Sequence, residues 1–203
     1  MSQKYIITGA PGTGKTSIIN ALKERGYSCV EENSREIIAE QIINGGEILP
    51  WKNQIAFENL ISRKRAKQYA SITKDEIYFF DRSAIDCIAY LKANNLEASD
   101  EILEAIKNCE FNSNVFYTPI WKEIYTNDSE RKEIIDEAIA IEKLLLETYI
   151  LFGYHLIEIP KFTIKESTNN EKITTLFSDN AKPLVNRYEF IKGFDEGSLD
   201  FYS

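Results

Sequence analysis

The chain has 203 residues, 43% of them hydrophobic, and its formal net charge at pH 7 is −8. This length and apolar content predict one domain with a sizeable buried core. The acidic balance argues against broad binding to nucleic acids or membrane surfaces, because such binding needs a basic face on the protein.

The first predicted elements are a strand and the glycine-rich loop that follows it. Residues 5–8, Tyr-Ile-Ile-Thr, are β-branched and aromatic, as is typical of a buried strand. Residues 9–16 read GAPGTGKT and match the phosphate-binding pattern GxxxxGK(S/T) at each fixed position. Apolar residues at 18, 19 and 22 predict a helix directly after the loop, and Gly26 marks its end.

The residue types in this loop suit the phosphates of ATP. Glycines let consecutive backbone N–H groups converge on an anion, and the N-terminus of the next helix adds further donors. We expect Lys15 to reach the β- and γ-phosphates and the hydroxyl of Thr16 to bind Mg²⁺. The expected nucleotide-binding residues are Gly9, Ala10, Pro11, Gly12, Thr13, Gly14, Lys15, Thr16 and Ser17.

A second strand, predicted over residues 27–31, leads into two carboxylates at positions 31 and 32. Asn33 with Glu36 three residues later predicts a capping box, and hence a helix that a pair of glycines ends. Glu32 could accept a proton from a substrate hydroxyl, with Arg35 one helical turn away as a further substrate contact. A solvated acidic pair is the alternative.

A longer helix, predicted from about residue 49, carries a basic run at residues 63–67. Neighbouring positions on a helix point about 100° apart, so these cations cannot all share one face. We expect Arg63 to face a substrate phosphate. A solvated basic face is the alternative.

The almost wholly apolar run at residues 77–81 predicts a central parallel strand that is buried on both faces. It ends in Asp81, at the edge where ligands bind in open α/β sheets, and we expect Asp81 to support Mg²⁺ through a water molecule. A cap on the next helix is the alternative. Arg82 follows at once, where hydrolytic ATPases of the broad AAA type usually have glutamate. An arginine cannot accept a proton from water, so Arg82 argues against a dedicated hydrolase.

The rest of the chain continues to alternate between helices and strands, which predicts βαβ units and a parallel sheet covered on both faces. Arg131, near the start of a long helix, could supply charge to a moving phosphoryl group when a loop closes. Ordinary pairing with acidic neighbours is the alternative. The remaining elements are predicted over residues 85–91, 99–108, 115–118, 129–152, 155–159 and 165–177.

The three cysteines have no metal-ligand spacing and lie in or beside apolar stretches, which predicts reduced, buried thiols. The first strand begins almost at the N-terminus, and no apolar run approaches the roughly 18 residues of a membrane span. We therefore expect no signal peptide, no membrane association and a cytoplasmic location.

Five segments together resemble a known group of proteins: GAPGTGKT, EENSRE, FFDRSAIDCIAY, TNDSERKE and GYHLIEIP. They are similar to small P-loop domains of the AAA type that resemble nucleoside kinases, near the ribosylnicotinamide kinase domain. The resemblance runs from about residue 4 to 160. It implies an α/β, three-layer P-loop NTPase fold with a five-stranded parallel sheet in the order 2-3-1-4-5 and helices on both faces. It also implies a lid at about residues 121–133 within a kinase-like domain over 1–179, and it leaves 180–203 as an unmatched C-terminal tail.

We therefore predict an ATP-dependent phosphotransferase that moves the γ-phosphoryl group to a small, nucleoside-like hydroxyl acceptor. The alternatives are an ATP-binding regulatory module that acts through a protein partner and, disfavoured by charge, an end-directed nucleic-acid kinase. A protein partner or a homo-oligomer stays open. The expected catalytic residues are Lys15, Glu32, Asp81, Arg82 and Arg131; the expected metal ligands are Thr16 and Asp81; and the expected substrate contacts are Glu32, Arg35, Arg63 and Arg82.

Overall fold

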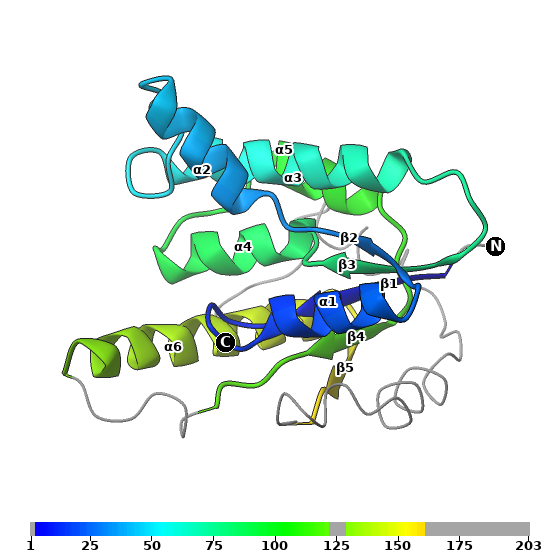
Figure 1. The fold of residues 1–203 in the computed structure, drawn as a ribbon. Coiled ribbons are helices and arrows are strands. Elements are labelled where there is room, and N and C mark those ends of the chain that lie inside the picture. Colours follow the sequence, from blue (N-terminus) through cyan, green and yellow to red (C-terminus); the bar gives the residue numbers. More distant parts are fainter. Residues whose placement is uncertain (1–2, 122–128, 161–203) are drawn as a thin grey trace.

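The computed structural model describes residues 3–121 and 129–160, with side chains described through residue 121 and from residue 135. Within these ranges, strands and helices alternate along the chain (Figure 1). The strands are β1 (Gln3–Thr8), β2 (Ser28–Val30), β3 (Ile77–Asp81), β4 (Asn114–Tyr117) and β5 (His155–Glu158). The helices are α1 (Lys15–Glu24), α2 (Ser34–Ile43), α3 (Gln54–Ala70), α4 (Ala84–Ala93), α5 (Asp100–Lys107) and α6 (Ser129–Leu151).

The strands form one parallel five-stranded sheet in the order β2-β3-β1-β4-β5. The expected α/β fold and strand order are thus confirmed. β1 lies at the centre, between β3 and β4, and its residues Ile6 and Ile7 have no exposed surface. A β-branched, apolar strand suits this place, since both of its faces are covered.

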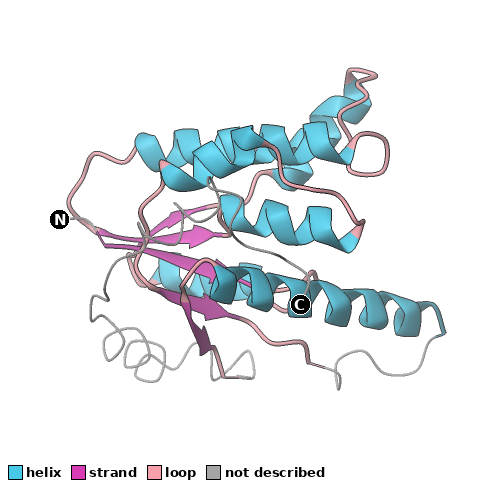
Figure 2. Cartoon of the chain, turned by 180° about the vertical axis from the view of Figure 1, so that it is seen from behind, coloured by secondary structure: helices cyan, strands magenta, loops and turns pink. Residues whose placement is uncertain are grey.

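Successive residues of the strands face opposite layers of helices, as the pleat of a sheet requires. Ile6 and Phe80 pack in one core cluster with residues of α3, α4, α5 and α6. Ile7 and Phe79 pack in a second cluster with Ile18, Ile19 and Leu22 of α1. The two layers are visible on either side of the sheet in Figures 1 and 2.

The ends of two helices differ from the sequence-based expectation. α2 begins after Asn33 as predicted, but Asn33 makes no capping hydrogen bond; its side-chain amide instead donates to Glu36 over 3.5 Å. The predicted capping box there is therefore wrong. A complete capping box occurs at α4, where the side chains of Ser83 and Asp86 each bond to the backbone of the other. α3 begins later than expected, at Gln54.

The described part of the chain includes all three cysteines, each as a free thiol, with Cys29 partly buried and the other two buried. None of the described helices combines the length and the hydropathy that crossing a membrane requires. Most of the predicted lid lies outside the described residues, as do the predicted last helix and the tail over 180–203.

Glu58 of α3 is a carboxyl group buried in the packing between α3 and α4, with 5% of its surface exposed. Burial raises its pKa to about 7, although a hydrogen bond with Cys87 and the charge of Arg65 act in the opposite direction. A carboxyl group with a raised pKa in the folded state favours folding less as pH rises, because the unfolded chain ionises first.

We predict that Glu58→Gln stabilises the protein at pH 8 and changes its stability little near pH 5. Between the ordinary pKa of 4.5 and the raised value of about 7, wild-type stability falls with pH, and an uncharged amide does not share this loss. Urea unfolding at both pH values checks this, with Glu40→Gln at an exposed position as the control. An equal gain at both pH values would contradict the account.

Candidate active site

The carboxyl ends of β1, β2 and β3 lie at one edge of the sheet and open into a cavity of about 590 Å³. This volume is in the range of small-molecule sites. The cavity joins the phosphate-binding loop to the residues that follow β2 and β3. Its lining is formed by Pro11, Gly12, Gly14, Lys15, Thr16, Ile19, Asn20, Glu31, Glu32, Arg35, Asp81, Arg82 and Tyr90.

The glycine-rich loop is held against the residue that follows β4. Gly9 has φ +149°, and a Cβ atom on it would lie 2.7 Å from the carbonyl oxygen of Thr118 and closer still to its hydroxyl. Thr13 donates a hydrogen bond from its hydroxyl to the carbonyl of Ala10 (2.9 Å) and shares another with the Thr118 hydroxyl (2.6 Å). Glycine is required at position 9 because the loop and Thr118 approach so closely.

Lys15 lies at the first position of α1, directly after the loop, and only 7% of its surface is exposed. Its Nζ atom donates to the carbonyl of Ala10 over 3.2 Å. Burial, followed by the charge of Arg82, lowers the pKa of Lys15 to about 8. The ammonium group therefore lies in a poorly solvated position where an anion would stabilise its charge.

Asp81 ends β3 beside this lysine. Burial raises the pKa of Asp81, an effect that the charges of Lys15 and Arg82 oppose. Its Oδ1 atom is buried and makes no hydrogen bond within the described part of the protein. A free carboxylate oxygen, with the Thr16 hydroxyl lining the same cavity, is the oxygen donor set that Mg²⁺ prefers. These two residues fit a magnesium ion that substrate phosphates and water would complete.

Glu32 lies across the cavity, in the segment after β2. Its Oε1 atom accepts a hydrogen bond from the Ser34 hydroxyl (2.7 Å) and lies 3.2 Å from Nε of Arg82 and 3.9 Å from Nη2 of Arg65. Burial alone would raise the pKa of Glu32, but the charges of these two arginines, helped by Ser34, lower it. Neighbouring Glu31 is exposed and pairs with Lys23 of α1. Glu32 is therefore kept ionised and is held in place by these partners.

Arg82 is 4% exposed and has φ 72°, a left-handed conformation that is rare for a residue with a side chain. Its N–H extends the sheet by donating to the carbonyl of Ile7 over 3.0 Å. Its guanidinium pairs with Asp86 at 3.1 Å and lies 5.4 Å from the ring centre of Tyr90. Strained residues of this kind cluster at functional sites.

The structure brings most of the predicted site residues together, and it moves one away. The cavity gathers Lys15, Thr16, Glu32, Arg35, Asp81 and Arg82. Arg63 does not line it, since its Nε atom pairs with Glu101 of α5 at 2.8 Å. Arg65 turns toward the site instead, where Nη1 donates to the carbonyl of Ser83.

Two residues at this site, Arg65 and Tyr90, have no role in the sequence-based prediction. Arg65 shares a helix face with the buried residues Glu58 and Ser62, so their helical spacing was the signal that could have selected it over Arg63. Tyr90 belongs to the segment after Asp81 that carried the resemblance, but no role was assigned to it. Arg131 lies in the first turn of α6, and its side chain is outside the described residues, so its role stays a prediction.

Comparison with known proteins gives a consistent picture of the fold. A family model described as an AAA domain matches residues 4–167. No curated protein matches the sequence significantly. Among solved structures, thymidylate kinase from Candida albicans is 17% identical, with a TM-score of 0.59 over 91% of this chain and 96% of that one.

Two further structures are similar. Deoxyadenosine kinase from M. mycoides is 18% identical, with a TM-score of 0.57 over 87% of this chain and 100% of that one. The NadR protein, solved in complex with NR, is 15% identical, with a TM-score of 0.58. The match covers 100% of this chain but only 52% of NadR, so this chain corresponds to about half of that protein.

We predict that binding of Mg·ATP at pH 8 takes up about half a proton from the solution, because the free Lys15 has a pKa of about 8 and a bound phosphate would keep it fully protonated. Titration calorimetry in two buffers with different ionisation enthalpies measures this uptake. At pH 6.5 the uptake should disappear, since Lys15 is then already protonated. Equal binding enthalpies in both buffers at pH 8 would contradict the assignment.

Proposed function

The chain belongs to the AAA domain family, and from this membership and the geometry of its site we propose that it is an ATP-dependent phosphotransferase. The family and the P-loop kinase fold imply nucleotide binding. We assign ATP with Mg²⁺ as the donor and a small, nucleoside-like molecule as the acceptor of the γ-phosphoryl group, on a hydroxyl. The cytoplasmic location stays a prediction.

One observation supports this proposal most directly. The phosphate loop, Asp81 and the carboxylate of Glu32 line a single cavity. A nucleotide whose phosphates lie in the loop would share this cavity with an acceptor whose hydroxyl bonds to Glu32. Positioning and charge stabilisation of this kind provide most of the catalysis in phosphoryl transfer.

The proposed reaction assigns roles to four of the residues that line the cavity. An oxygen–phosphorus bond forms between the acceptor hydroxyl and the γ-phosphorus while the bond to the β,γ-bridging oxygen breaks. Lys15 and the N-terminus of α1 stabilise the phosphate charge, and Asp81 and Thr16 hold Mg²⁺, which supplies further positive charge. Because its pKa is lowered, Glu32 orients the hydroxyl by accepting its hydrogen bond and takes the proton only late in the transfer.

Transfer to an alcohol is favoured over attack by water because of the residue that follows Asp81. The guanidinium of Arg82 cannot act as a base, because it stays protonated in proteins. Here it pairs with Glu32 and Asp86. The similar structures include enzymes named thymidylate kinase and deoxyadenosine kinase, and one protein solved with NR. These names support a small, nucleoside-like acceptor for the present chain.

A regulatory ATP-binding module that acts through a protein partner is the second candidate. Exposed apolar side chains on α2 and after it favour this reading, since Ile43 is 82% exposed and Trp51 64% exposed. A module of this kind would hydrolyse ATP slowly and would not respond to small acceptors.

Glu32→Gln should reduce acceptor phosphorylation by about 10²–10⁴-fold and leave ATP affinity nearly unchanged, because general-base assistance and orientation are lost while the phosphate loop is intact. Coupled measurement of ADP release against a panel of nucleosides checks this. Glu31→Gln is the matched control, since Glu31 lines the same cavity but pairs with Lys23. Rapid hydrolysis without any acceptor that Glu32→Gln abolishes would assign the carboxylate to water.

Arg131→Ala should lower kcat far more than it raises the KM for ATP, because we expect its contact to strengthen as charge develops on the moving group. Lys132→Ala is the control, since it removes a charge of the same sign from the adjacent position in the sequence. Steady-state kinetics with the best acceptor of the panel distinguish the two variants. An unchanged kcat in Arg131→Ala would contradict the role proposed for Arg131.

A further inference from the structure

The carboxylate of Asp86, in the first turn of α4, is the most densely bonded group near the active site. It has no exposed surface. Its Oδ1 atom accepts hydrogen bonds from the Thr8 hydroxyl at 2.7 Å and from Nη1 of Arg82 at 3.1 Å. Its Oδ2 atom accepts from the backbone N–H of Ser83 at 2.9 Å and from the Tyr149 hydroxyl. Donors from the end of β1, the β3–α4 turn and α6 thus converge on one side chain.

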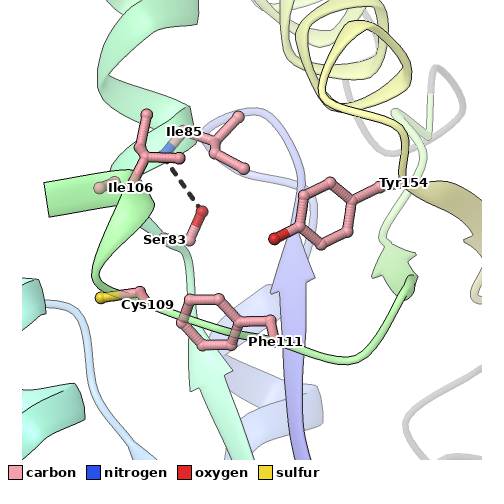
Figure 3. Close-up of a pocket in the computed structure, with 7 residues that line it drawn as sticks. Ser83, Ile85, Ile106, Cys109, Phe111 and Tyr154 are labelled. Carbon is pink, nitrogen blue, oxygen red and sulfur yellow. Dashed lines mark hydrogen bonds between the residues drawn. The ribbon is translucent and has the colours of Figure 1, made fainter. Parts of the chain in front are cut away.

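The hydroxyl groups in this cluster have a defined direction of donation. An ionised carboxylate only accepts, so the Tyr149 hydroxyl donates its proton to Asp86. The Tyr149 oxygen therefore accepts from the Ser83 hydroxyl, 2.8 Å away. The Ser83 oxygen in turn accepts from the backbone N–H of Ile85 at 3.2 Å, the bond drawn in Figure 3. These groups form a chain of hydrogen bonds, called the relay below, that runs from the N–H of Ile85 through the hydroxyls of Ser83 and Tyr149 to Asp86.

The charges around Asp86 keep it ionised. Burial alone would raise its pKa, but Arg82 from the β3–α4 turn and Arg65 from α3 lower it, with further help from the Tyr149 hydroxyl on α6 and the Ser83 N–H. An ionised, buried carboxylate is stable only when its oxygens accept hydrogen bonds, so each group that donates to Asp86 contributes to keeping it in place.

The two groups that donate to Oδ1 of Asp86, Thr8 and Arg82, connect it to the active site. Thr8 directly precedes Gly9, the first residue of the phosphate loop. Arg82 contacts Glu32, the carboxylate assigned to the acceptor, at 3.2 Å. Arg82 is also the residue with the strained φ of 72°, and such a conformation persists only when its surroundings hold it. Asp86 therefore links the end of β1, which leads into the phosphate loop, to the arginine that contacts Glu32.

Packing alone does not explain a tyrosine at position 149. Its ring is fully buried and packs edge-on against Tyr154 with ring centres 5.6 Å apart, contacts that phenylalanine would also make. Ser83 and Tyr154 also border a separate cavity of only about 10 Å³ (Figure 3), which is too small for a substrate. The hydroxyls of Ser83 and Tyr149 thus lie inside the protein. The Ser83 hydroxyl bonds to the Tyr149 oxygen, and the Tyr149 hydroxyl donates to Asp86.

We propose that Ser83 and Tyr149 are positioning residues for phosphoryl transfer, which act through Asp86 to fix Arg82 and Glu32 relative to the phosphate loop. The proposal rests on the proposed function, because it assigns these hydroxyls to the same reaction. Neither residue touches the cavity that holds the reacting groups. Their loss should therefore change turnover more than the binding of ATP.

The test compares Tyr149→Phe, Ser83→Ala and Ser83→Thr with the wild type. Tyr69→Phe is the matched control: Tyr69 packs against the same core cluster, and its hydroxyl donates to the backbone carbonyl of Glu110 over 2.7 Å, away from the site. Each variant is measured for melting temperature, for kcat and KM with ATP and the best acceptor of the nucleoside panel, and for the titration of Asp86 by carboxyl ¹³C NMR.

We expect Tyr149→Phe to lower kcat about tenfold, the order expected for a lost hydrogen bond to a charged group, with the KM for ATP unchanged. Ser83→Ala should lower kcat by a smaller factor, because the Ser83 hydroxyl bonds to the Tyr149 oxygen and not to Asp86 itself. The Asp86 titration should move to higher pH in both variants. Ser83→Thr, which keeps a hydroxyl, should restore kcat. The double variant Ser83→Ala/Tyr149→Phe should be no worse than Tyr149→Phe, because the Ser83 hydroxyl acts on Asp86 only through the Tyr149 hydroxyl. Tyr69→Phe removes a tyrosine hydroxyl that bonds away from the site and should keep full turnover.

Unchanged kcat in Tyr149→Phe would overturn the proposal and leave the hydroxyl as a structural feature, and so would an unmoved Asp86 titration. The same loss of turnover in Tyr69→Phe would also overturn it, since the cause would then be general destabilisation. A wild-type protein that phosphorylates no acceptor would instead refute the proposed function. That result is distinct, because it is read from the wild type alone.

Discussion

The parallel pairing of β1 with β3 is the constraint on which the rest of the site depends. In this register Ile7 lies opposite Asp81, and β2 continues the alignment with Val30 opposite Phe80. All three strands therefore end at the same edge of the sheet. The segments that leave β1 and β2 carry the glycine loop and Glu32, and Asp81 is the last residue of β3. Parallel strands need crossover helices, and the first crossover begins with α1, whose N-terminus completes the anion site.

Buried charge is the second organising factor. Arg65 and Arg82 lie among Glu32 and Asp86 with little solvent contact, an arrangement that is stable only because the charges compensate one another and are hydrogen-bonded. The same pairing has a functional consequence. It holds Glu32 ionised and in one place, on the side of the cavity where we propose that the acceptor binds, and it prevents Arg82 from serving as a mobile cation. Lys15, by contrast, is bonded only to a backbone carbonyl among the hydrogen bonds described, and is available to a phosphate.

The sequence predicted the features that depend on local pattern. The loop spacing predicted the phosphate site, and the apolar run before Asp81 predicted a central strand. Tertiary packing decided the rest. Which arginine of the run 63–67 turns inward depends on how α3 packs against α4, so Arg65 rather than Arg63 approaches the site. The contact between Asp86 and Tyr149 joins residues 63 positions apart, and no local pattern reports it.

The most direct test of the central claim is the fate of the γ-phosphoryl group when the purified protein turns over ATP in ¹⁸O-labelled water with a panel of nucleosides. The account predicts that one or more nucleosides receive the group as an unlabelled phosphate ester, detected by mass spectrometry, and that labelled inorganic phosphate forms only slowly. Labelled inorganic phosphate formed rapidly, at a rate independent of every nucleoside and with no ester detected, would contradict it and assign the site to hydrolysis.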